Sequence, residues 1–154
     1  MRLILALSAL AMAVQMAQAE VMQAAVDGVT LNISAEAVKK QLGAPQKESM
    51  SEPNACNDDL PDMQLHYDGM LMTLSKNADG AYTVTSIDVT SPDRSLGNVR
   101  IGDSEQKVKD VFGATDLARS TLSYDLGEPG SGQTYEFTIQ NDTVAHIKLN
   151  TYMC

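Results

Sequence analysis

Tryptophan is absent from this chain of 154 residues, and phenylalanine occurs only twice. With five tyrosines, aromatic residues make up 5% of the sequence. Because large rings normally supply much of the buried area of a core, we expect a core built from valine, leucine, isoleucine and methionine instead. Apolar residues still form 44% of the chain, which is ordinary for a globular protein.

Basic residues are also scarce. The chain has 11 lysines and arginines against 20 aspartates and glutamates, which gives a formal net charge of −9. Such a charge repels phosphate backbones and anionic lipid surfaces. We therefore expect no nucleic-acid binding, whereas a partner with a basic surface fits the charge of the chain.

No run of about 20 apolar residues, the length needed to span a bilayer, is present. The apolar stretch at residues 3–14 follows Arg2 and precedes a small-x-small sequence at residues 17–19. This is the pattern of a cleaved signal peptide. We expect residues 1–19 to be removed, which leaves a periplasmic or secreted protein of net charge −10 that begins at Glu20 and has no membrane insertion.

Only two cysteines occur, Cys56 and Cys154. In an exported chain, two thiols are best interpreted as one disulfide. They do not form the Cys-x-x-Cys motif of redox enzymes, so we expect a structural bond that ties the end of the chain to its first half.

A repeated hydrophobic pattern relates residues 28–45 to residues 98–115 when Gly43 is aligned with Gly113. Each copy continues to a Leu-x-Tyr-Asp sequence and ends in a β-like segment. A repeat of this kind predicts one packing unit used twice. We expect an α+β fold of two tandem repeats, each a helix plus a three-to-four-stranded antiparallel sheet with the helices on one face. The repeats would cover residues 20–96 and 97–154.

Local signals place the two helices. Ser34 and Ser104 precede apolar positions at helical spacing, and Gly43 and Gly113 supply the stop. The first copy contains 13 extra residues between its glycine and its tyrosine. We expect this segment, which falls within residues 47–61, to be an acidic loop that carries Cys56.

The sequence from Ile101 to Gly113, Ile-Gly-Asp-Ser-x-x-x-Val-x-x-x-Phe-Gly, resembles two groups of exported bacterial proteins. One is the proteinaceous β-lactamase inhibitors, and the other is the small outer-membrane assembly lipoproteins of the SmpA/OmlA type. The resemblance covers nearly all of the mature chain and implies a shared fold of tandem repeats. It also implies that the protein binds other proteins. In the inhibitors, a concave sheet makes this contact.

No sequence motif of an enzyme stands out. The two histidines, His66 and His146, lie in expected strands without a nearby cysteine or a nucleophile-elbow sequence. We therefore expect a protein without catalytic residues and without a cofactor. A hydrolase whose site is assembled only in three dimensions remains an alternative.

Metal binding is the second alternative. The acidic loops lack the ligand spacing of a calcium site, which favours solvated loops. A copper or small-ligand site is more specific, because thioether and imidazole groups suit Cu(I) and four such residues fall within ten positions. They are Met63, His66, Met70 and Met72. Core packing is the competing interpretation of the methionines, and we assign no metal ligand from the sequence.

The function that the sequence favours is non-catalytic binding of another exported or envelope protein, as an enzyme inhibitor or an envelope-assembly accessory. Tyrosine is common at interfaces, and Tyr67 and Tyr124 occupy equivalent places in the two copies. A structural role for these two side chains across the sheet is an equal alternative. With the acidic residues Asp58, Asp59 and Asp62, they are the contact residues that we expect.

Overall fold

The computed structural model describes residues 25–126 and 132–151, so the expected signal peptide lies outside the described residues. The described chain forms seven strands, two α-helices and a 3-10 helix, η1. In sequence order the elements are α1 (Ala35–Leu42), β1 (Lys47–Asn54), η1 (Ala55–Asn57), β2 (Leu60–Tyr67), β3 (Met70–Lys76), β4 (Tyr82–Val89), α2 (Glu105–Phe112), β5 (Thr121–Asp125), β6 (Gln133–Gln140) and β7 (Thr143–Thr151).

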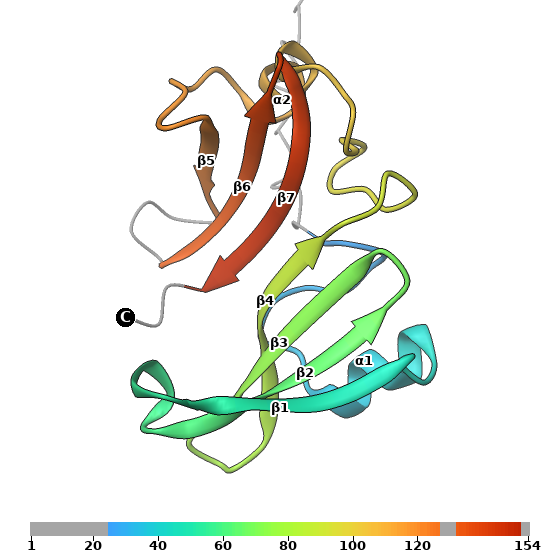
Figure 1. The fold of residues 1–154 in the computed structure, drawn as a ribbon, viewed down its shortest axis with the longest axis vertical. Coiled ribbons are helices and arrows are strands. Elements are labelled where there is room, and N and C mark those ends of the chain that lie inside the picture. The colour runs from blue at the N-terminus through green and yellow to red at the C-terminus, as the bar shows by residue number, and fades with distance from the viewer. Residues whose placement is uncertain (1–24, 127–131, 152–154) are drawn as a thin grey trace, which may run out of the picture.

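The strands form one antiparallel sheet in the order β1-β2-β3-β4-β7-β6-β5 (Figure 1). The predicted fold class, an α+β fold of two tandem repeats of a helix plus a three-to-four-stranded antiparallel sheet, is therefore wrong. The physical reason is the pairing of β4 with β7, in which Ile87 lies opposite Leu149 and Val89 opposite Ile147. This pairing joins the strands of both halves into a single sheet, and two helices of eight residues each add little to it.

The two helices begin and end where the local signals predict. The Ser34 and Ser104 hydroxyls each accept a hydrogen bond from a backbone N–H of the first turn, at 3.2 Å in both cases. Gly43 and Gly113 end the helices with φ of 82° and 101°, a region that favours glycine. In the described part of the chain, no helix is long and apolar enough to cross a membrane.

Residues 47–54, predicted as loop, form the edge strand β1 instead. The segment is polar and contains Pro53, so it lacks the alternation of apolar residues that predicts a strand. It pairs with β2 from Lys47 opposite His66 to Asn54 opposite Leu60, with an irregularity between Met50 and Pro53. Proline and bulges are common on edge strands, where they hinder pairing with a further chain.

The core lies on the side of the sheet that the helices cover. Val38 of α1 and Val108 of α2 are fully buried against it. The strands contribute alternate residues that are also fully buried, such as Leu65, Met72 and Ile147. The core is rich in valine, leucine, isoleucine and methionine, as the composition predicts, and among the described residues Phe137 is the one aromatic ring that is fully buried.

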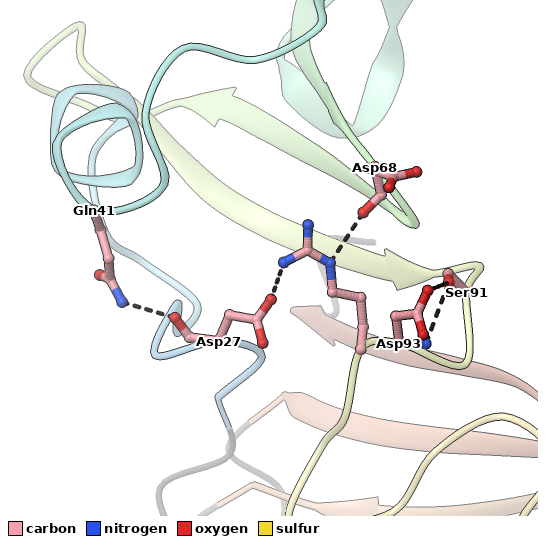
Figure 2. Close-up of polar contacts among 6 residues, drawn as sticks. Asp27, Gln41, Asp68, Ser91 and Asp93 are labelled. Carbon is pink, nitrogen blue, oxygen red and sulfur yellow. Dashed lines mark hydrogen bonds and ion pairs between the residues drawn. The ribbon is translucent and has the colours of Figure 1, made fainter.

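Arg94 ties together three segments that are far apart in the sequence (Figure 2). Its Nε donates to the backbone oxygen of Asp68 at 3.0 Å, in the turn between β2 and β3. Its guanidinium also pairs with the Asp27 carboxylate, and the Asp27 backbone oxygen accepts from Gln41 of α1. The side chain therefore fixes the N-terminal segment and the linker between β4 and α2 against the first half of the sheet.

We expect Arg94→Ala to lower the free energy of unfolding by about 1–2 kcal/mol, because charge-assisted hydrogen bonds contribute more than neutral ones. Urea denaturation would measure the change. Arg94→Lys keeps the charge but cannot reach both partners with a planar fork, so it should recover only part of the loss. Equal stability of the alanine variant and the wild type would show that the tie contributes nothing.

Candidate functional site

One face of the sheet is covered by the helices, and the opposite face is not (Figure 1). Most cross-strand pairs on the uncovered face are polar, as for Gln64 with Thr73 and Glu136 with Lys148. Leu71 is an apolar exception, paired with His66 and with Asp88. The partly exposed or polar residues of this face in β2, β3, β4, β6 and β7 include Asp62, Gln64, His66, Leu71, Thr73, Ser75, Ser86, Asp88, Thr134, Glu136, Thr138, His146, Lys148 and Asn150. In the described part of the chain, no helix covers this polar face.

The carboxylate of Asp62 is the most buried acidic group on this face, with 9% of the residue exposed. Its Oδ1 accepts from Asn57 Nδ2 at 2.9 Å and from Ser75 Oγ at 2.7 Å, and its Oδ2 accepts from Asn54 Nδ2. Its own backbone N–H donates to Ser51. These bonds hold the segment of β1 and η1 over the end of β2 and β3.

A hollow of about 240 Å³ opens beside this network, which we call the Asp62 pocket. Strands β3, β4 and β7 form its floor and the segment around η1 forms a wall. Its lining residues are Asn54, Cys56, Asn57, Asp62, Thr73, Ser75, Thr85, Ser86, Asp88, Lys148, Asn150 and Thr151. Except for Cys56, all carry polar or charged side chains, which distinguishes the pocket from an apolar ligand cavity.

A second acidic group, Asp88, lies at the junction between β4 and β7. Its Oδ1 is 3.3 Å from His146 Nε2 and 3.9 Å from Lys148 Nζ. Its Oδ2 accepts from Ser86 Oγ at 3.3 Å. Asp62 differs from Asp88, because no lysine, arginine or histidine in the described part of the chain lies within 4.0 Å of its carboxylate.

The acidic residues predicted as contacts do not share one surface. Asp58 and Asp59 are exposed in the turn after η1, both with positive φ, of 51° and 58°. Asp62 is buried, accepts three hydrogen bonds and lines the pocket. Whether any of the three contacts a partner stays a prediction.

Tyr67 and Tyr124 pack against the core, on the helix-covered side of the sheet. Their hydroxyls donate to the backbone oxygens of Gly43 and Gly113, at 2.9 and 3.0 Å. Burial is the main cause that raises the pKa of each hydroxyl above its usual value. The structure therefore gives both tyrosines the same structural contact, at the C-terminal end of a helix.

We expect Tyr67→Phe and Tyr124→Phe each to lower the free energy of unfolding by about 0.5–1.5 kcal/mol, because each removes one hydrogen bond to a helix end. Tyr82→Phe is the matched control, since no hydrogen bond of its hydroxyl is found in the described structure and Tyr82 also packs against the core. Thermal denaturation of the three variants would measure the effect. A loss as large in the control would assign the change to ring packing.

The methionines and histidine of the alternative copper site do not point to one place. Met70 and Met72 lie in the core, with 2% and 0% exposed, whereas His66 lies on the uncovered face, where its Nε2 is 3.3 Å from Ser49 Oγ. Met63 packs against the core. Among the described residues, no group of three or more histidine, cysteine, aspartate or glutamate side chains could hold a metal ion. We therefore build no proposal on this set.

The contact of Ser49 with His66 brings a hydroxyl near a potential base. In the described residues, however, no carboxylate is found bonded to the other ring nitrogen of His66, so the third member of a catalytic triad has no counterpart here. Cys56 is not a free thiol. Cys154 lies outside the described residues, so the predicted disulfide between them stays a prediction.

Sequence reasoning missed most of the pocket. Ser75, Thr85 and Asp88 belong to strands that the sequence analysis identified by their apolar residues. Lys148 and Asn150 lie near the C-terminus, far from the other lining residues in the sequence. The signal that could have found them is the polar half of the alternation in the central strands. Such an alternation predicts a solvated sheet face, although it does not show that a hollow forms there.

No family model matches this chain, and no curated protein matches it. Among solved structures, the chain is similar to the crystal structure of an extracellular protein containing an SCP domain from Bacillus anthracis strain Ames. The match covers 80% of this chain and 44% of that one, at 10% sequence identity and a TM-score of 0.48. The chain therefore spans less than half of that structure, and a likeness at this level carries no argument about function.

Proposed function

We propose that this protein is exported and binds another exported or envelope protein through the uncovered face of its sheet, without catalysing a reaction. The observation that carries the proposal is the face itself, which runs across β2, β3, β4, β7 and β6 without a covering helix. An inhibitor or an envelope-assembly accessory is the concrete form of this function.

The chemistry of the face supports protein binding over catalysis. Its serine and threonine side chains lose less conformational entropy when they are covered than its long side chains, such as Gln64 and Lys148, do. The buried carboxylate of Asp62 already accepts three hydrogen bonds, so it is a poor general base. The excess of acidic residues favours a partner with a basic surface.

The test is capture of a partner from an envelope extract with the mature, oxidised protein as bait, followed by two matched variants. Gln64→Arg places a long cationic side chain on the uncovered face, and Gln106→Arg places the same side chain on the exposed surface of α2. We expect Gln64→Arg to weaken binding of the captured partner about tenfold or more, and Gln106→Arg to leave it unchanged.

Two results would overturn the proposal. One is a partner that binds both variants as tightly as the wild type, because the uncovered face would then lie outside the interface. The other is a partner lost from Gln106→Arg alone, which would place the interface on the helices. Circular dichroism of both variants confirms that neither loses its fold.

A further inference from the structure

The hydroxyl groups of Ser75 and Thr85 in the Asp62 pocket donate to other groups of the protein. Ser75 Oγ uses its single proton on Asp62 Oδ1 at 2.7 Å, so in its 3.1 Å contact with Thr85 Oγ1 it must accept. Thr85 Oγ1 also lies 3.2 Å from the Thr73 backbone oxygen, which can only accept. The hydroxyl protons on this side of the pocket are therefore committed to groups of the protein.

A buried acceptor without a partner lies in the same wall. Asn54 Nδ2 donates to Asp62 Oδ2, which fixes the orientation of the amide because a carboxylate cannot donate to it. Asn54 Oδ1 is then buried, and it has no hydrogen-bond partner among the residues that the structure describes. An unsatisfied buried oxygen is costly and rare in folded proteins, so a further hydrogen-bond donor at this wall would stabilise the site.

The charge of the pocket indicates what that donor carries. Asp62 and Asp88 contribute two carboxylates, and Lys148 is the one cation among the lining residues. Lys148 lies 3.9 Å from Asp88 and also sits opposite Glu136 in the register of β6 and β7. The negative charge of Asp62 is left without a cationic partner among the described residues, which favours a cationic donor.

The size of the pocket limits the ligand to one functional group. Clefts that enclose a whole small molecule usually measure about 300–1,000 Å³, and this one measures about 240 Å³. Arginine presents five N–H donors in a planar fork that matches carboxylates and spaced acceptors. A lysine ammonium is a point charge and reaches fewer of them at once.

We propose that the Asp62 pocket binds the guanidinium group of an arginine side chain that projects from the partner protein. This inference rests on the proposed protein-binding function and names the contact that gives it specificity. The arginine would pair with Asp62 and Asp88 and donate to Asn54 Oδ1, at the place where the uncovered face is hollowed. The net negative charge of the chain favours the approach of such a side chain.

The probe is Nα-acetyl-arginine amide, with Nα-acetyl-citrulline amide as its neutral isostere. Both are titrated into the ¹⁵N-labelled mature protein, and the side-chain amide signals of Asn54 and Asn57 are followed. We expect saturable shifts with the arginine compound in the millimolar range and none with citrulline. Equal shifts with both compounds, or none with either, would overturn the inference.

Variants locate the contact. Asp88→Asn should weaken binding of the arginine probe about threefold to tenfold, and Asp62→Asn, where it folds, about tenfold or more. Asp142→Asn removes the same charge from the exposed turn between β6 and β7 and should change nothing. Unchanged binding in Asp88→Asn, or an equal loss in Asp142→Asn, would contradict binding in the pocket.

A competition assay tests the arginine contact separately from the proposed protein-binding function. The arginine probe should displace the captured partner, whereas a free-arginine site unrelated to the partner would not. If Gln64→Arg weakens the partner but the probe neither binds nor competes, the protein-binding function stands and the arginine contact is wrong. If Gln64→Arg also has no effect on the partner, both proposals fail.

Discussion

Replacing Asp62 with alanine should lower the free energy of unfolding by about 2–4 kcal/mol. The substitution removes the acceptor of Asn57, Ser75 and Asn54 at once, and each buried donor left without a partner costs about 1–3 kcal/mol. Water that enters through the pocket can satisfy some of them, so the three costs should not add fully.

Two comparisons make the Asp62 result specific. Asp116→Ala removes an acidic side chain from an exposed loop and should change stability by less than about 0.5 kcal/mol. Asp62→Asn keeps one acceptor oxygen and should fall between the wild type and the alanine variant. An alanine variant as stable as the wild type in urea would show that the network does not hold η1 in place.

Replacing Phe137 with alanine should cost about 3–5 kcal/mol, the range found for large-to-small changes of fully buried rings. Phe137 has 0% of its surface exposed. Its ring lies 5.0 Å from that of Phe112 on α2 and 6.1 Å from that of Tyr124 on β5. Its removal would leave a cavity between α2 and the sheet, bordered by the rings of Phe112, Tyr124 and Tyr135.

Urea denaturation would measure this loss, with Phe137→Leu as the variant that keeps most of the apolar volume. We expect the leucine variant to recover more than half of the loss, since volume-conserving changes are tolerated best. Partner binding per folded molecule should not change in either variant, because Phe137 lies on the helix-covered side. A partner lost by the folded leucine variant would contradict that separation of the two faces.

The helices could be predicted from the sequence because their signals are local. Ser34 and Gly43, like Ser104 and Gly113, mark a start and a stop within one short segment. The fold class could not, because it depends on the pairing of β4 with β7, which are about 60 positions apart along the chain. The pattern of apolar and polar residues within β4 or β7 does not predict which strand pairs with it.

The candidate site shows the same limit. Asp62 could be selected as an acidic residue, but its burial depends on Asn54, Asn57 and Ser75 closing around it. Tyr67 could be selected as an aromatic residue, but its contact with Gly43 follows from how β2 packs beside the end of α1. A sequence gives the type of each residue. It predicts the side of the sheet on which a residue lies only where apolar and polar residues alternate regularly.

Both histidines of the chain, His66 and His146, lie on the uncovered face, so they report directly on whether a partner covers it. Labelling with diethyl pyrocarbonate, free and in complex with the captured partner, is the most direct measurement. We predict that the partner protects both histidines, while carbethoxylation of the exposed Lys40 on α1 by the same reagent is unchanged. Histidines that react equally in both states, together with protection of Lys40, would contradict the assignment of the sheet face as the binding surface.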